Sequence, residues 1–322
     1  MSSIKPDPAL LKKYPNAVTT QQLEEKSRFL GTLLGLAAGE SLGAGFEFKK
    51  QGEFTPPKEI LGGGIWQPGE PTDDVELTLS LLRVVSRGRF SLDDTAQGYL
   101  KWFSGKPKDI GNLTKAALQN LKAGEGPEQS GALAWEDGGR KAAGNGSVMC
   151  CAPIGLLHAR SLEGLTDDAT AASRITHADP RCIGGCIAVA TAVALLVRGE
   201  KDAEEAVPRA ALAGGAVSDD VRRVIERASA KKPEDLTVDG HDRGFVLHTV
   251  ELAFSALIHS PTLEEGLIAV VARGGDTDTN ACVAGALLGA KFGKGQVPER
   301  WVTKLKAAPE LTALAEQLHR QL

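Results

Sequence analysis

The stretch RGGDTDTNACVAGALLGA, residues 273–290, sets two aspartates and two threonines between a pair of glycines and a run of small apolar residues. The run ACVAGALLGA is typical of a close-packed helix, and the polar residues before it mark the start of that helix. A helix start needs only one capping oxygen, which Asp276 or Thr277 can supply. The stretch offers four side-chain oxygen groups. The oxygens that capping does not use therefore indicate that this stretch also binds another group.

A second stretch, PTDDVELTLSLL at residues 71–82, has the same arrangement. It follows a Gly-rich approach and sets Thr72, Asp73 and Asp74 directly before a helix whose apolar positions are Val75, Leu77, Leu79, Leu81 and Leu82. Taken alone, each cluster fits a plain N-cap whose acidic residues are favoured by the helix dipole. Because the pattern occurs twice, it indicates a function beyond helix capping.

Together the two clusters predict a metal centre. If the two helix starts face each other, four carboxylates and two hydroxyls converge, and that much negative charge requires either protonation or cations. Divalent cations are the simpler answer. The ligands are all oxygen, which favours Mg²⁺ or Mn²⁺ over zinc or copper. Six protein ligands are enough for two ions.

Helical periodicity runs through nearly the whole chain and predicts an all-α fold. Apolar residues recur at helical spacing in the segments ELTLSLLRVV, NLTKAALQNL, GFVLHTVELAFSALI and TLEEGLIAVVA, whereas strand signals are scarce. We expect a compact bundle of about ten or more helices, given ordinary helix lengths. Residues 21–322 are expected to form a single domain, and residues 1–20, rich in Pro and Lys, a loosely held extension.

Composition limits the classes of partner. The 322-residue chain is 42% hydrophobic and carries a formal net charge of −4, so nucleic-acid or membrane-surface binding has no electrostatic support. The longest apolar run, residues 187–197, is too short to span a bilayer. Five cysteines in apolar surroundings fit reduced, buried thiols, and the spacing of His177, Cys182 and Cys186 matches no familiar zinc site. We expect a cytoplasmic protein, or a nuclear one in a eukaryote, and a monomer.

Four sequence motifs resemble those of a known protein family. TDD opens one helix, GNGSVM lies in a mid-chain loop, ITHAD precedes a helix, and GGDTDTNACVAGALLGA lies near the end of the chain. In this order they resemble the ADP-ribosylglycohydrolase family. The resemblance implies an all-α fold and a binuclear Mg²⁺ centre that cleaves the bond between C1″ of ADP-ribose and an acceptor, such as a protein arginine or serine. It also implies the six metal ligands, which are Thr72, Asp73, Asp74, Asp276, Asp278 and Thr279.

The resemblance extends to residues around the metals. Glu47, in GLAAGESLGAGFEF, matches an acidic residue that closes over the ions, although it also fits a solvated surface glutamate. Asp109 and Gly111, in DIGNLTKAAL, match residues of the bacterial branch, where the Asp lines the acceptor side. His177 would contact the nucleotide, or else be a packed core residue. The segment expected to bind the pyrophosphate through backbone N–H groups and a hydroxyl is Gly144, Asn145, Gly146, Ser147, Val148 and Met149.

The expected reaction is attack of water at C1″ through an oxocarbenium-like state. The carboxylates expected to take part are Glu47, Asp109, Asp74 and Asp278, which orient groups or accept the proton of the water. No covalent nucleophile is required.

The chain also departs from the family pattern. Cys150 stands where many members have an arginine, and Ala142 and Ala143 stand where some relatives have a stacking aromatic residue. The adenine then needs another partner, for which Trp66, Trp102 and Trp135 are candidates. Three alternatives stay open: hydrolysis of ADP-ribose-1″-phosphate or O-acetyl-ADP-ribose, a non-catalytic ADP-ribose-binding module, and a helical scaffold whose acidic clusters merely cap helices.

Overall fold

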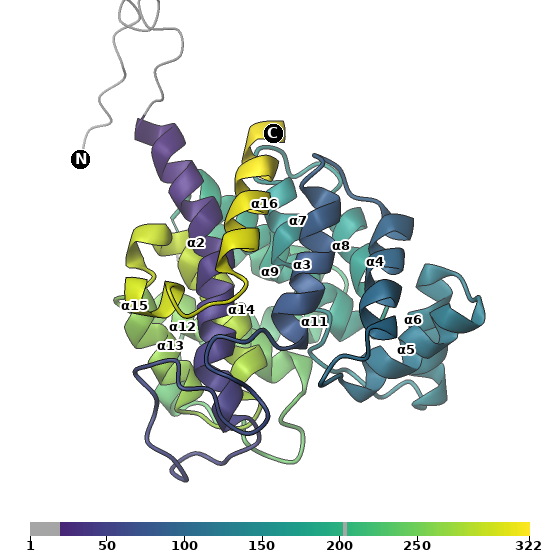
Figure 1. Ribbon diagram of the computed structural model, residues 1–322, viewed down its shortest axis with the longest axis horizontal. Helices are drawn as coiled ribbons and strands as arrows, with labels where there is room; N and C mark the ends of the chain where they lie inside the picture. Colours follow the sequence, from purple (N-terminus) through teal and green to yellow (C-terminus); the bar gives the residue numbers. More distant parts are fainter. Residues whose placement is uncertain (1–19, 202–204) are drawn as a thin grey trace, which may run out of the picture.

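The computed structural model describes residues 20–201 and 205–322, and over these residues the chain is helical with no β-strand. The predicted all-α fold is confirmed. The predicted N-terminal extension lies outside the described residues, apart from Thr20, which begins helix α2. The α-helices, labelled as in Figure 1, are α2 (Thr20–Gly43), α3 (Asp73–Val85), α4 (Leu92–Ser104), α5 (Asn112–Ala123), α6 (Pro127–Asp137), α7 (Ala152–Leu157), α8 (Leu165–Arg174), α9 (Pro180–Arg198), α10 (Val207–Gly215), α11 (Asp219–Ala228), α12 (Val246–His259), α13 (Leu263–Val271), α14 (Thr277–Phe292), α15 (Glu299–Val302) and α16 (Ala308–Gln321).

The centre of the fold is an antiparallel pair of helices, α2 and α14, which lie side by side in Figure 1. A Cβ added at Gly35 would lie 2.4 Å from the Gly285 carbonyl oxygen, and one added at Gly289 would lie 2.0 Å from the Gly31 carbonyl oxygen. The two backbones therefore touch directly, because only glycine allows this approach. This contact explains the small residues of ACVAGALLGA and fixes where α14 begins.

The remaining helices surround this pair. α9 packs against α7, α8 and α10, while α12 and α13 cover α14 and α16 lies against α2. Two interior helices, Thr20–Phe46 and Pro180–Arg198, are long and apolar enough to cross a membrane by length and composition. In this protein 89% and 83% of their apolar windows are buried. They are therefore accounted for as core helices of the bundle.

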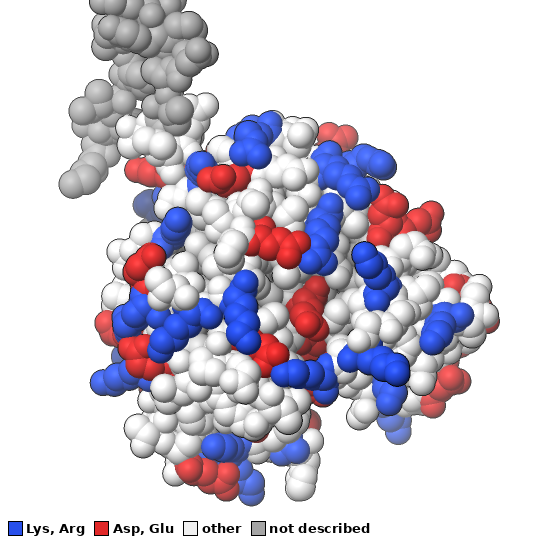
Figure 2. Space-filling model, viewed as in Figure 1, with Lys and Arg blue, Asp and Glu red and all other residues white. Residues whose placement is uncertain are grey.

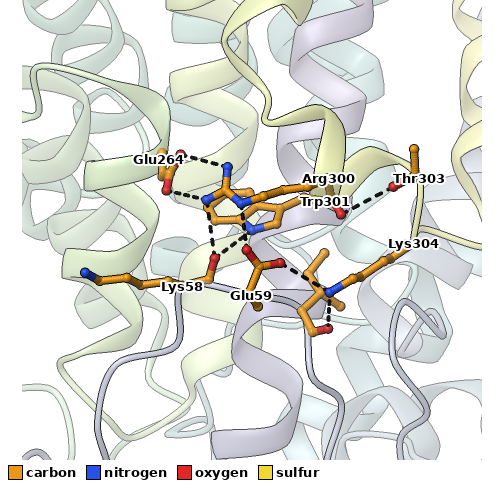
Figure 3. Close-up of polar contacts among 8 residues, drawn as sticks. Lys58, Glu59, Glu264, Arg300, Trp301, Thr303 and Lys304 are labelled. Carbon is orange, nitrogen blue, oxygen red and sulfur yellow. Dashed lines mark hydrogen bonds and ion pairs between the residues drawn. The ribbon is translucent and has the colours of Figure 1, made fainter.

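Helices α5 and α6 pack on each other and project at one edge of the molecule (Figure 1). On the opposite side, a long loop leads from α2 through the short 3₁₀ helix η1 (Ala44–Phe46) to α3. The α15 region anchors this loop: Arg300 Nε lies 2.7 Å from Glu59 Oε1, and Trp301 Nε1 donates to the Lys58 carbonyl at 3.0 Å (Figure 3). The anchor holds the segment between Glu47 and Thr72 in place.

Candidate active site

The start of α3 and the start of α14 lie against each other. Thr279 Oγ1 donates to Asp74 Oδ2 at 3.4 Å, across a sequence separation of 205 residues. Thr72, Asp74, Asp276, Asp278 and Thr279 are all buried, while Asp73 is half-buried. The two clusters of the sequence thus form one buried group of carboxylates and hydroxyls.

The two starts differ in how they are capped. The Thr72 hydroxyl accepts from the Asp74 N–H at 3.4 Å, as an N-cap does. Asp276 stands at the N-cap of α14, yet within the described chain its side chain accepts no capping hydrogen bond from that helix. Its Oδ2 instead accepts from Asn145 Nδ2 at 2.9 Å. Helix capping therefore does not account for the Asp276 carboxylate.

Two glycines set the direction of the Asp276 loop. Gly274 and Gly275 have φ values of 68° and 72°, in the left-handed region that favours glycine. A Cβ on Gly275 would lie 2.4 Å from the Val238 carbonyl oxygen. The Gly275 carbonyl also accepts from the Phe48 N–H at 2.7 Å. The glycines of RGGD thereby tie the loop that carries Asp276 to the loop that carries Glu47.

Glu47 joins the acidic group from this second loop. One carboxylate oxygen each from Glu47, Asp276 and Asp278 lie within 4.8 Å of one another. Burial, together with the negative charges of Asp276, Asp109 and Asp73, raises the pKa of Glu47 to about 8, while Arg243 opposes the shift. Glu47 is half-buried, so it lies between the solvent and the buried carboxylates.

Asp73, Asp74 and Asp278 also resist ionisation. Burial raises the pKa of Asp73 to about 7, with Asp109 and Asp276 adding to the effect. Burial, helped by Asp276 and Glu47, raises the pKa of Asp278 well above its usual value, and the pKa of Asp74 is raised by burial, Asp73 and Glu40. Divalent cations would relieve this crowding of acidic groups.

One atom of the group is unsatisfied. Asp74 Oδ1 is buried and has no hydrogen-bond partner among the residues described. A buried acceptor without a partner is costly unless a proton or a cation meets it. An all-oxygen donor set with an unsatisfied buried oxygen fits Mg²⁺ or Mn²⁺.

Glu40 is a member of the site that the sequence did not single out. It is 1% exposed, and its Oε1 accepts from the Thr72 N–H at 2.6 Å, the Thr72 hydroxyl at 2.8 Å and the Val75 N–H at 3.2 Å. Burial raises the pKa of Glu40 to about 8, against the lowering effect of these hydrogen bonds. Glu40 thus holds the first turn of α3. A glutamate within the small apolar residues of GLAAGESLGAG is the signal that could have found it.

A cleft of about 610 Å³ opens in front of the acidic group. Of the six predicted ligands, Asp73, Asp276, Asp278 and Thr279 line this cleft, whereas Thr72 and Asp74 lie behind them. The other predicted site residues that line it are Glu47, Asp109, Gly111, Gly144, Asn145, Gly146, Met149 and His177. Asp109 lies exposed at the cleft, and the Gly111 N–H donates to the Asp73 carboxylate.

Two residues of the predicted phosphate loop do not line the cleft. Ser147 and Val148 are buried behind the loop, and Ser147 Oγ accepts from Ser173 Oγ at 3.0 Å. The loop itself is held by Asn145, whose N–H donates to the Gly244 carbonyl at 3.1 Å. The surface that the loop offers to a ligand is therefore made by Gly144, Asn145, Gly146 and Met149.

His177 is both packed and part of the cleft. It is 2% exposed, and its ring lies against the glycines of the loop, since a Cβ on Gly146 would be 2.8 Å from His177 Cε1. Burial lowers the pKa of His177 to about 4, so the ring is neutral at pH 7. Nδ1 lies 2.9 Å from Thr176 Oγ1. His177 Nε2 lies on the side of the loop glycines, since a Cβ on Gly144 would be 3.3 Å from it.

The aromatic residues of the cleft are not the expected ones. Trp66 and Trp102 line a different hollow, and Trp135 donates its indole N–H to Asp179 at 3.1 Å. Phe48 and Phe245 line the cleft instead, together with His241 and Asp242. Sequence reasoning missed the 241–245 segment because it lies far along the chain from every motif. Its pairing with the 144–149 loop, through the bridge between Gly144 and Phe245, appears only in three dimensions.

A sequence model of the ADP-ribosylglycohydrolase family matches residues 21–322. The chain belongs to the ADP-ribosylglycohydrolase family. It is an ADP-ribosylglycohydrolase-type hydrolase, as the resemblance of its motifs predicted.

Relatives in this family carry names that describe ADP-ribosyl hydrolysis. The ADP-ribosyl-[dinitrogen reductase] glycohydrolase of Rhodospirillum rubrum is 28% identical over 86% of this chain and 90% of its own. The ADP-ribosylarginine hydrolase Tri1 of Pseudomonas putida is 28% identical over 97% of this chain and 82% of its own. Among solved structures, an ADP-ribosylglycohydrolase-related protein complex superposes with a TM-score of 0.80 at 31% identity, covering 93% of this chain and 99% of that one.

Proposed function

We propose that this enzyme hydrolyses the C1″ linkage between ADP-ribose and an arginine side chain of a protein, and that it requires two Mg²⁺ ions. The observation that carries the proposal is the buried acidic group at the floor of a cleft that also contains a glycine-rich loop and a neutral histidine. Mn²⁺ is the alternative metal, because the oxygen donors suit both ions.

The metal set is proposed from the residues present. Thr72, Asp73, Asp74, Asp276, Asp278 and Thr279 would hold the ions, and the orphaned Asp74 Oδ1 is the strongest local argument for a cation. Bound Mg²⁺ would supply Lewis-acid stabilisation of the negative charge that develops on oxygen during cleavage.

The chain's own groups supply binding and proton transfer. Gly144, Asn145 and Gly146 offer a glycine-rich surface for the pyrophosphate. Glu47 is half-buried beside Asp276 and Asp278, where its carboxyl can act as a general acid or base. Glu47 lies between the solvent and the buried carboxylates, so it is the group best placed to take the proton from an attacking water. Phe48 and Phe245 offer ring faces at the cleft for the adenine.

The arginine acceptor is supported by charge. Asp109 lies exposed in the cleft beside Gly111 and Asn112, and a guanidinium can pair with a carboxylate through two charge-assisted hydrogen bonds. Relatives named for ADP-ribosylarginine hydrolysis are among those most similar over the full chain. We also propose the cytoplasm as the place of action, since all five cysteines are free and buried thiols.

The test is a panel of ADP-ribosylated acceptors incubated with the enzyme and Mg²⁺, with released ADP-ribose measured by chromatography. ADP-ribosyl-arginine should be hydrolysed faster than ADP-ribosyl-serine, ADP-ribose-1″-phosphate and O-acetyl-ADP-ribose. Faster turnover of ADP-ribose-1″-phosphate or O-acetyl-ADP-ribose would show that the preferred acceptor is a small group and not arginine. Binding of ADP-ribose without turnover of any compound would establish a binding module.

A further inference from the structure

A groove on the surface of the described chain takes no part in the chemistry proposed for the cleft. It has a volume of about 940 Å³, against about 610 Å³ for the cleft. It lies between α3 and α4 and continues along the loop that follows α4. Figure 2 shows this face hollowed there, with basic side chains along the rims and acidic ones in the middle.

The groove is more basic than the chain as a whole. Five basic residues line it against three acidic ones, on a protein whose formal net charge is −4. The basic residues are Arg83, Arg87, Lys101, Lys106 and Lys108, and the acidic ones are Glu70, Glu76 and Asp94. The excess of positive charge favours an anionic partner.

Two of these cations are available for such a partner. Arg83 pairs with Glu310 at 2.8 Å and Arg87 with Asp94 at 3.2 Å. Lys101 and Lys106 are exposed, and neither lies in an ion pair with any residue that the structure describes. Lys101 lies in the last turn of α4 and Lys106 follows its end, and both line the groove.

The wall of the groove is partly apolar. Leu79 and Val84 of α3 and Trp102 of α4 line it, and Trp102 Nε1 donates to Glu76 Oε2 at 2.5 Å. Such a wall suits a chain with apolar side chains between its charges, because apolar contact adds to the attraction of the rim.

The groove begins where the acceptor side of the cleft ends. Lys108 lines the groove and Asp109, the next residue, lines the cleft. Pro71 lines the groove and is followed by Thr72 of the metal set. The ion pair between Lys108 Nζ and Glu70 Oε1, at 2.6 Å, joins the two segments that separate the hollows. A polypeptide that presents its modified side chain at Asp109 therefore has the groove directly beside it.

We propose that this groove docks an acidic, partly apolar segment of the ADP-ribosylated protein, next to the modified arginine. The proposal rests on the proposed function, because it takes the acceptor to be a polypeptide. It makes the groove a determinant of which protein is demodified, while the cleft determines which bond is broken.

The test compares three substrates on matched variants. One is free ADP-ribosyl-arginine, one is an ADP-ribosylarginine peptide flanked by Asp, Glu and Leu, and one is a peptide of equal length flanked by Ser and Gly. The variant is Lys101→Glu with Lys106→Glu. The control is Lys122→Glu with Lys231→Glu, which makes the same charge change at exposed lysines outside the groove.

The wild type should have a kcat/KM for the acidic peptide on the order of tenfold above that for the neutral peptide, and the groove variant should lose this preference. Turnover of free ADP-ribosyl-arginine should stay unchanged in both variants. Equal kcat/KM for the two peptides in the wild type, or an equal loss of preference in the control variant, would overturn the docking proposal.

A second measurement separates docking from the proposed reaction. The fluorescence anisotropy of the labelled acidic peptide, without ADP-ribose, should report saturable binding to the wild type and weaker binding to the groove variant. This binding is expected even if ADP-ribosyl-arginine is not hydrolysed. Absence of hydrolysis would contradict the proposed function but not the docking proposal. Displacement of the peptide by ATP at lower concentration than by unlabelled peptide would assign the groove to a nucleotide and overturn the proposal.

Discussion

Replacing Glu40 by Gln should remove a large part of the pH dependence of stability in the metal-free protein. The pKa of the Glu40 carboxyl is raised from 4.5 to about 8 by burial. Because the folded pKa lies above the unfolded one, the carboxyl contributes stability that is fully present below pH 4.5 and is lost as the pH rises through 8. Glutamine keeps the oxygen that accepts from Thr72 and Val75 but cannot ionise.

The magnitude follows from linkage. At 1.36 kcal/mol per pKa unit, Glu40 alone should lower the free energy of unfolding by about 3 kcal/mol between pH 5 and pH 8. Asp73 and Glu47, with pKa values raised to about 7 and about 8, should add to the loss in the wild type. Glu40→Gln should therefore show a pH-dependent loss smaller by about 3 kcal/mol than the wild type.

The assay is urea unfolding in excess chelator at pH 5 and pH 8, on the wild type, on Glu40→Gln and on the control Glu125→Gln. Glu125 is an exposed glutamate in the turn between α5 and α6, so its replacement should leave the wild-type pH dependence intact. If Glu40→Gln loses as much stability as the wild type over this range, the buried carboxyl is not protonated in the folded protein and the reasoning fails.

Further predictions concern the metals, the acceptor and the central helix pair. Asp276→Asn should reduce hydrolysis of ADP-ribosyl-arginine at least about a hundredfold while leaving the metal-free protein folded, as seen by circular dichroism, because it removes one charge from a crowded acidic group. Asp109→Ala should slow cleavage of ADP-ribosyl-arginine by an amount on the order of 2 to 4 kcal/mol in transition-state binding, but leave ADP-ribose-1″-phosphate equally or more rapidly cleaved; equal losses in kcat/KM on both would refute a role in acceptor choice. Gly285→Ala should destabilise the protein by about 1–3 kcal/mol in thermal unfolding, since its Cβ would lie 2.1 Å from the Gly35 carbonyl oxygen. Gly295→Ala, where a Cβ meets open space, is the matched control, and an equal effect of both changes would contradict the packing argument.

Periodicity and motif order were enough to predict the helical fold and the family. The helical spacing of apolar residues is local, so it can be read along the chain, and the clusters at Thr72 and Asp276 are marked by more oxygen than a helix cap needs. The glycines before Asp276 and within α14 were visible as a pattern of small residues. The sequence does not show why these residues are small. The reason is the direct contact of α14 with the backbone of α2.

The rest of the site depends on contacts between distant segments. Glu40 accepts from Thr72, a residue 32 positions further along the chain, and Phe245 reaches the cleft through its bridge to Gly144. Neither contact leaves a local signature. The sequence makes Trp66 and Trp102 candidates for contact with the adenine. In the fold, the loop before α3 and the end of α4 place them in the neighbouring groove. The identity of an aromatic residue does not show whether it lies in the cleft or in the groove.

A titration of the metal-free protein with Mn²⁺, followed by electron paramagnetic resonance, tests the proposed binuclear metal site directly. Two Mn²⁺ ions should bind per chain, their spectra should show coupling between neighbouring ions, and Asp276→Asn should weaken the binding. Binding of no ion at the acidic group, with ADP-ribosyl-arginine still hydrolysed at full rate in excess chelator, would contradict the proposed metal site.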